Sequence, residues 1–365
     1  MSIILFIIIL AVLVFVHELG HFLFAKKAGI RVDEFGLGFP PRLFGKKVGE
    51  TIYSINAIPF GGFVKIFGED PNDESINGPD RDRSFVHKKR PVQAAVLVAG
   101  VLFNFLFAFV LNTVGFASGF PVAVEGWSGQ GQLQNIQLLI TDIVPESPAS
   151  FAGLKSGDAL QSLKSDKDKI EGDLEAEEVR QFIRDHASVP IAVSVSRKAE
   201  LFEFSVETKI MQGEPNPIIG ISMEKVASLR LPIHLAVLEG FKMTYFSAKS
   251  VLFGFGELLK QAFHGGVSIS QLTGPVGIAG MVGSARDLGI SYLLSFTAFL
   301  SINLAVLNLL PFPALDGGRI LFVAIEGVTR RRLNQNITNT LNALGFILLL
   351  LLMFFVTYQD IAKLF

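Results

Sequence analysis

The sequence predicts a polytopic α-helical membrane protein with four transmembrane helices, a membrane-associated β-hairpin and one β-rich domain outside the lipid. Half of the 365 residues are hydrophobic and the mean hydropathy is +0.48, which is high for a soluble protein. Charged residues still make up 18% of the chain, too many for a chain that lies wholly in lipid. Four separate apolar stretches are each long enough to cross about 30 Å of hydrocarbon.

The predicted spans are residues 3–25, 92–117, 292–311 and 341–358. The first has no basic start and no small-residue cleavage site, so we expect a retained span and not a signal peptide. Basic residues gather after the first span and after the third, which predicts that both loops are cytoplasmic. The N-terminus, residues 118–291 and the C-terminus are then expected outside. The net charge of −1 gives no sign of a nucleic-acid partner.

The first membrane half, residues 1–118, also contains an apolar β segment. Residues 52–67 are rich in β-branched and aromatic residues around a Pro-Phe-Gly-Gly sequence. This pattern predicts a hairpin of two strands, 53–58 and 63–67, that lies against the membrane or dips into it. The upstream Gly-Leu-Gly-Phe sequence at residues 36–39 is interpreted as a glycine-rich turn.

Residues 119–230 differ in composition and predict a separate extracytoplasmic domain with its core at about 134–224. Strands are expected at 136–144, 189–198, 201–210 and 218–223, with a short helix after Pro148 and an amphipathic helix over 175–187. Residues 231–291 predict amphipathic helices on the outer membrane surface, because charges interrupt their apolar pattern. A fifth span within 231–263 is the alternative. Residues 292–365 form the second membrane half.

The first span carries polar residues that a lipid-facing helix would not need. A charged side chain at the centre of a span costs about 2.5–3.5 kcal/mol. His17, Glu18 and His21 form an H-E-x-x-H sequence, in which positions i and i+4 share one helical face. Both imidazoles can therefore bind one metal ion, with Glu18 placed to deprotonate a bound water. The chain has no cysteine, so further ligands must be His, Asp or Glu.

A catalytic zinc usually takes three protein ligands, and Asp316 is the candidate for the third. It follows Pro311 and Pro313 at the end of the third span and precedes two glycines. An N-cap role for the following helix is the alternative. Fourteen apolar residues precede His17, or about 21 Å of helix, so the histidines lie nearer the cytoplasmic face. Four spans put Asp316 on that same face, whereas a fifth would put it on the other.

Several motifs together resemble the site-2 protease family of intramembrane zinc metalloproteases. They are HELGH in the first span, G-x-x-x-N at Gly100 to Asn104 in the second, LTGPVGIAG at 272–280 and NLLPFPALDGG at 308–318. The sequence SPA-x-x-AGL-x-x-GD at 147–158 resembles a PDZ domain of the permuted bacterial kind. The likeness is greatest to the bacterial regulator of sigma-E protease type. That protease has tandem PDZ domains, whereas this chain has room for one.

The resemblance implies that His17, His21 and Asp316 bind Zn²⁺ and that Glu18 is the general base. It implies that Asn308 and Asn104 contact the substrate backbone or the developing oxyanion. It also implies peptide-bond hydrolysis in or near the transmembrane segments of single-span proteins in the bacterial cytoplasmic (inner) membrane. Anti-sigma factors and remnant signal peptides are both candidate substrates, and the PDZ-like domain is expected to bind a peptide or to exclude bulky ectodomains.

Two other functions stay open on the residues alone. The first is a catalytically silent membrane scaffold with a PDZ-like domain, which a missing catalytic residue would favour; all four positions are filled. The second is a metal or proton transporter that uses the intramembrane His and Asp residues. Transporters often contain internal repeats, and the sequence shows none. A two-histidine, one-carboxylate set also suits iron, although these ligand types favour zinc.

Overall fold

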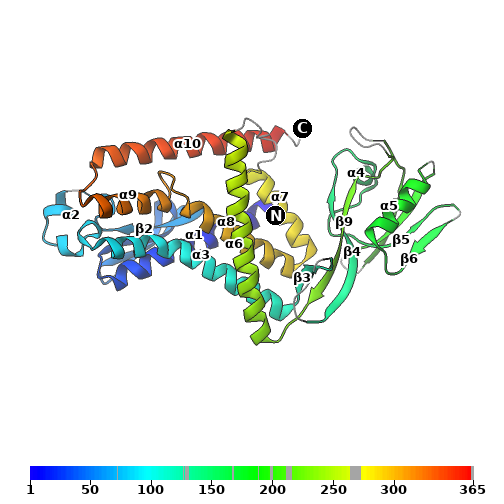
Figure 1. The fold of residues 1–365 in the computed structure, drawn as a ribbon, viewed down its shortest axis with the longest axis horizontal. Helices are drawn as coiled ribbons and strands as arrows, with labels where there is room; N and C mark the ends of the chain where they lie inside the picture. The colour runs from blue at the N-terminus through cyan, green and yellow to red at the C-terminus, as the bar shows by residue number, and fades with distance from the viewer. Residues whose placement is uncertain are drawn as a thin grey trace. The chain divides into compact units, whose positions relative to one another are not determined.

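The computed structural model describes residues 1–71, 73–125, 127, 131–166, 168–187, 189–197, 200–210, 216–263 and 273–362. The chain divides into two compact units (Figure 1). The first contains Met1–Asn112, Gly240–Gly283 and Phe296–Phe365, and the second contains Thr113–Glu239 and Ser284–Ser295.

Four helices in the described part of the chain are long and apolar enough to cross a membrane, as the sequence predicted. Their side chains are apolar nearly all round, which suits contact with lipid on one side and with neighbouring helices on the other. The four helices are α1 (Ser2–Lys27), α3 (Arg90–Ser118), α8 (Ile290–Leu309) and α10 (Gln335–Ala362).

The helices α6 (Ile233–Phe263) and α7 (Pro275–Leu288) fall within the region where amphipathic helices were expected. The 31-residue helix α6 is not among the candidate spans. It runs across α3 and α8 in Figure 1, and its Val251 packs near Ala108 and Ala298 of those helices. By length and composition, α6 does not qualify as a fifth span.

The start of α7 explains the Gly-Pro-Val-Gly sequence in this segment. The backbone N–H groups of Gly274 and Gly277 donate to the carboxylate of Asp360 in α10, at 3.1 and 2.8 Å. A Cβ atom on either glycine would lie 2.8 to 3.3 Å from an Asp360 oxygen. The glycines thus let a buried carboxylate satisfy N–H groups that a helix start leaves free.

The hairpin is larger than the sequence predicted. Strands β1 (Val32–Val48) and β2 (Thr51–Ile66) are antiparallel and turn at Gly49. The first half of β1 pairs on both sides, so that Phe35 lies opposite Tyr53 and also opposite Val64. The prediction that segments 53–58 and 63–67 pair with each other is wrong, because residues 34–37 lie between them.

The glycine-rich turn expected at residues 36–39 is also wrong, because these residues belong to β1. A Cβ atom on Gly36 would lie 2.6 Å from the Phe63 ring, and one on Gly62 would lie 2.8 Å from the Gly36 carbonyl oxygen. The glycines therefore allow the close approach of two strands and do not make a turn. After the hairpin come the short helix α2 (Asp73–Asn77) and 3₁₀ turns at Arg81–Arg83 and Phe85–His87.

The second unit contains the expected β-rich domain. Its sheet has the strand order β3-β9-β4-β5-β7-β8, and β6 pairs with β5. The strands are β3 (Phe120–Ala123), β4 (Leu133–Ile143), β5 (Ala159–Lys164), β6 (Lys169–Glu171), β7 (Ile191–Arg197), β8 (Glu200–Val206) and β9 (Ile221–Leu229). The helices α4 (Pro148–Ala152) and α5 (Ala176–Asp185) fall where two helices were predicted.

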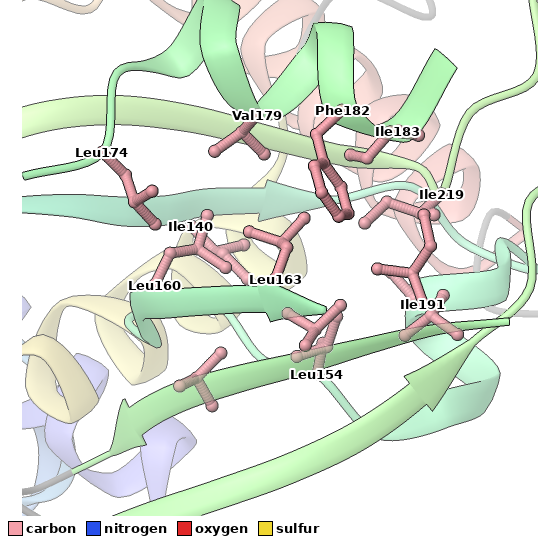
Figure 2. Close-up of a cluster of buried hydrophobic side chains, with 14 of the residues drawn as sticks. Ile140, Leu154, Leu160, Leu163, Leu174, Val179, Phe182, Ile183, Ile191 and Ile219 are labelled. Carbon is pink, nitrogen blue, oxygen red and sulfur yellow. The ribbon is translucent and has the colours of Figure 1, made fainter. Parts of the chain in front are cut away.

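Helix α5 covers one face of this sheet (Figure 2). Its Val179, Phe182 and Ile183 pack on strand residues that include Ile140 and Leu163. The buried carboxylate of Asp158 in the Gly-Asp turn pairs with the partly buried Arg197, whose Nε lies 2.6 Å from Asp158 Oδ1. The unit therefore has its own hydrophobic core, as a separately folded domain requires.

Candidate active site

Helix α1 places His17 and His21 on one buried face, 7% and 6% exposed. Their spacing of four residues is one helical turn, so the two rings meet edge to face with their Nε2 atoms 3.2 Å apart. Two imidazole nitrogens that point at the same place are suited to sharing one metal ion.

Asp316 joins them from α9 (Asp316–Thr329), 295 residues further along the chain than His21. Its Oδ2 atom lies 2.9 Å from His17 Nε2 and 3.2 Å from His21 Nε2. The N-cap residue of α9 is Leu315, and no side chain caps this helix end. The alternative prediction that Asp316 is the N-cap is therefore wrong. The sequence-predicted trio is therefore brought together.

The geometry of the trio fits a zinc ion. Oδ2 of Asp316 is buried and has no hydrogen-bond partner, although two imidazole nitrogens lie beside it. The carboxylate oxygen and the two imidazole nitrogens thus direct their lone pairs towards a common point, as metal ligands do. Ligands at 2.0–2.1 Å from a tetrahedral zinc are about 3.3 Å apart, close to the separations of these three atoms.

Two glycines let α1 and α3 approach closely enough to build this site. A Cβ atom on Gly20 would lie 2.4 Å from the Ala99 carbonyl oxygen. A Cβ atom on Gly100 would lie 2.3 Å from His21 Nε2 and 2.7 Å from His17 Cε1. The glycines of HELGH and of G-x-x-x-N are thus steric requirements of the same helix crossing.

The second nitrogen of each histidine also has a partner. His21 Nδ1 donates to the Val96 carbonyl oxygen over 2.8 Å, which directs Nε2 towards Asp316. His17 Nδ1 lies 3.3 Å from the side-chain amide of Asn104, which is fully buried. The amide oxygen of Asn104 has no hydrogen-bond partner, and rotating the amide by 180° would allow this oxygen to accept from an Nδ1–H of His17. Asn104 therefore lies beside a candidate ligand.

Glu18 contacts a residue that sequence reasoning did not find. Its Oε2 accepts a hydrogen bond of 3.1 Å from the backbone N–H of Val64 in β2. That N–H points away from β1, so residues 62–66 are an edge strand that runs beside α1. A backbone donor carries no signature in the amino-acid sequence, which is why only the fold reveals it.

Asn308 differs from the other candidates. It lies in the last turn of α8, partly buried, and its side chain makes no hydrogen bond to any residue that the structure describes. The two glycines after Asp316 have a clear steric role, since a Cβ atom on Gly317 would lie 2.1 Å from the Leu310 carbonyl oxygen. The chain can reverse this tightly between α8 and α9 only with glycine there.

A buried His-His-Asp cluster with an adjacent carboxylate, carried by apolar helices, is the arrangement that a membrane metalloprotease requires. Comparison with known proteins agrees. The model of a family described as Peptidase family M50 matches residues 5–352. The chain belongs to peptidase family M50.

Relatives are similar over nearly their whole length. The zinc metalloprotease RasP of Geobacillus kaustophilus is 32% identical, with 100% of this chain and 98% of the relative covered. The regulator of sigma-W protease RasP of Bacillus subtilis is 30% identical, with 100% and 99% covered. A putative zinc metalloprotease of Clostridium perfringens is 36% identical over 96% and 95% of the two chains. The chain is thus a membrane metalloprotease whose cofactor is zinc.

Proposed function

We propose that this protein hydrolyses peptide bonds in or near the transmembrane segments of single-span proteins of the bacterial cytoplasmic membrane. The observation that carries the proposal is the convergence of His17, His21 and Asp316 next to Glu18 on a helix built to span lipid. Family membership favours this function over the scaffold and the transporter. His17, His21 and Asp316 would hold the zinc ion, and Glu18 would be the general base.

The chain's own residues then perform the proton transfers. Bound zinc supplies Lewis-acid polarisation of the scissile carbonyl and lowers the pKa of a bound water. Glu18 accepts the proton of the attacking water and later donates it to the leaving amide nitrogen. Asn104 would keep His17 oriented, and Asn308, whose side chain has no hydrogen-bond partner among the described residues, would be available to the substrate backbone or the oxyanion.

A transmembrane helix hides its carbonyl groups in hydrogen bonds, so the substrate must unwind locally before hydrolysis. The edge strand 62–66 offers it an extended partner, because its Val64 N–H faces the active site and not β1. Main-chain hydrogen bonds to such an edge are a general way to hold an extended peptide. The membrane-associated hairpin is therefore the proposed substrate-positioning element.

The proposed substrate class is supported by the name of one relative and fits the proposed topology. A relative in Bacillus subtilis is named a regulator of sigma-W, which makes anti-sigma factors one candidate and remnant signal peptides another. In the proposed topology the PDZ-like unit and the N-terminus are outside, and the active site is near the cytoplasmic side. The PDZ-like unit would then bind a peptide end or exclude substrates with bulky ectodomains.

The direct test uses purified full-length protein in detergent with a model single-span substrate. Cleavage by the native chain should stop on zinc chelation and return when zinc is added. Glu18→Gln keeps the shape of the side chain but removes the base, so cleavage should fall by roughly 10²–10⁴-fold. Glu18→Gln activity near that of the native chain would contradict the assigned base.

A further inference from the structure

An ion pair joins helix α9, which begins with Asp316, to the segment that follows β2. Arg319 lies three residues after Asp316, on the same side of α9. Its Nη1 donates to Oε1 of Glu69, just beyond the end of β2, and its Nη2 lies 3.6 Å from Asp70 Oδ1. The pair joins the helix that carries Asp316 to the hairpin whose Val64 contacts Glu18.

The surroundings make this pair more than a surface contact. The side chains of Arg319 and Glu69 are only 32% and 19% exposed. Burial raises the pKa of Glu69, and the neighbouring Arg319 opposes that rise. The guanidinium also interacts electrostatically with Asp316 and Glu18. Arg319 is thus a largely buried cation that is paired with Glu69 and lies close enough to the active site for its charge to act on Asp316 and Glu18.

Helix α9 also has other contacts: Ile320 and Val323 pack against a hydrophobic cluster that includes Phe35 of β1. The inner side of α9 borders a cavity of about 100 Å³, lined by Glu69, Arg319, Val323 and Glu326 among others. At its other end, Glu326 Oε2 pairs with Arg90 Nη1 of α3 over 2.7 Å. Glu326 is ten residues from Asp316, or about 15 Å along the helix, whereas Arg319 is within one turn.

We propose that Arg319 and Glu69 are positioning residues that hold α9, and with it Asp316, at the separation from His17 and His21 that zinc requires. This proposal rests on the proposed zinc protease function. Without the pair, α9 could shift on its hairpin contact, and the third ligand would move relative to the other two. Metal sites lose about 10–100-fold in affinity when the groups that orient their ligands are removed.

If the Arg319–Glu69 pair only balanced charge, loss of Arg319 would change the zinc affinity in the opposite direction. Replacing Arg319 by an apolar residue removes a positive charge near the metal, which by Coulomb attraction alone should tighten zinc binding. A positioning role predicts weaker binding from the same substitution. The sign of the change therefore separates the two explanations.

The experiment measures the zinc affinity of purified full-length variants by competition with a chromophoric chelator. We expect Arg319→Met and the charge-neutral double variant Arg319→Met with Glu69→Gln each to bind zinc at least about tenfold more weakly than the native chain. The double variant leaves no unpaired buried charge and so is the safer of the two for folding. Glu326→Gln, at the other ion pair of α9, is the matched control and should change zinc affinity less than about threefold.

Native-like or tighter zinc binding by Arg319→Met, or by the double variant, would overturn the positioning role while the protease proposal stood. An equal loss in Glu326→Gln would also overturn it, because the effect would then be a general loosening of α9. Failure of the native chain to bind zinc would instead overturn the proposed function itself. Near-native zinc affinity in Arg319→Lys, which keeps a cation opposite Glu69, would support the ion pair as the feature that positions α9.

Discussion

At the scale of single residues, the site depends on which nitrogen of each imidazole faces the metal. Val96 holds His21 through Nδ1, and Asn104 is the group beside Nδ1 of His17. The family resemblance pointed to Asn104 as a substrate contact. Its full burial and its place behind His17 favour a ligand-orienting role, in which the amide oxygen accepts the Nδ1–H.

Substitution of Asn104 distinguishes these two roles. Asn104→Leu removes the acceptor, and we expect zinc affinity to fall by about tenfold or more. Asn104→Asp still offers an oxygen to His17 and should bind zinc more tightly than Asn104→Leu. Chelator competition measures both variants. Full zinc affinity in Asn104→Leu, combined with lost cleavage, would show that Asn104 serves the substrate and not the metal site.

At the scale of elements, the hairpin connects the base to the proposed substrate site. The sequence predicted strands in 52–67 correctly but paired them wrongly. Their true partner, residues 32–48, contains glycines, two prolines and several charges, which are weak signals for a strand. The free edge of residues 62–66 can be identified only from the pairing register of β1 and β2, which leaves the Val64 N–H facing Glu18.

A proline at Val64 tests the edge strand directly. Val64→Pro removes the outward N–H, which donates to Glu18 in this structure and would donate to a bound substrate, but it removes no hydrogen bond to β1. Cleavage of a transmembrane substrate should therefore fall at least about tenfold, the effect of losing roughly 1.5 kcal/mol. Val64→Ala keeps that N–H and should cleave faster than Val64→Pro. Rates are compared with the same single-span substrate, and zinc content serves as the folding control. Equal rates in the two variants would exclude strand addition at this edge.

At the scale of the whole molecule, the described chain combines four candidate spans with a β-rich unit that has its own core. The sequence was sufficient for the spans, for the two helices and several strands of that unit, and for the grouping of His17, His21 and Asp316, because apolar length and ligand spacing are local patterns. It did not predict the short strands β3 and β6. The sequence could not predict the site contacts of Val64, Glu69 or Arg319. Their contacts join residues 46 and 250 positions apart, and no local pattern encodes such pairs.

We expect the H-E-x-x-H helix and Asp316 to form one zinc site whose chemistry depends on Glu18. The most direct measurement is the zinc content per chain of the purified native protein, Glu18→Gln and Asp316→Ala, each assayed for cleavage in parallel. We predict one zinc per chain in the native protein and in Glu18→Gln, cleavage only by the native protein, and loss of both in Asp316→Ala. Full zinc content together with cleavage in Asp316→Ala would contradict the claim.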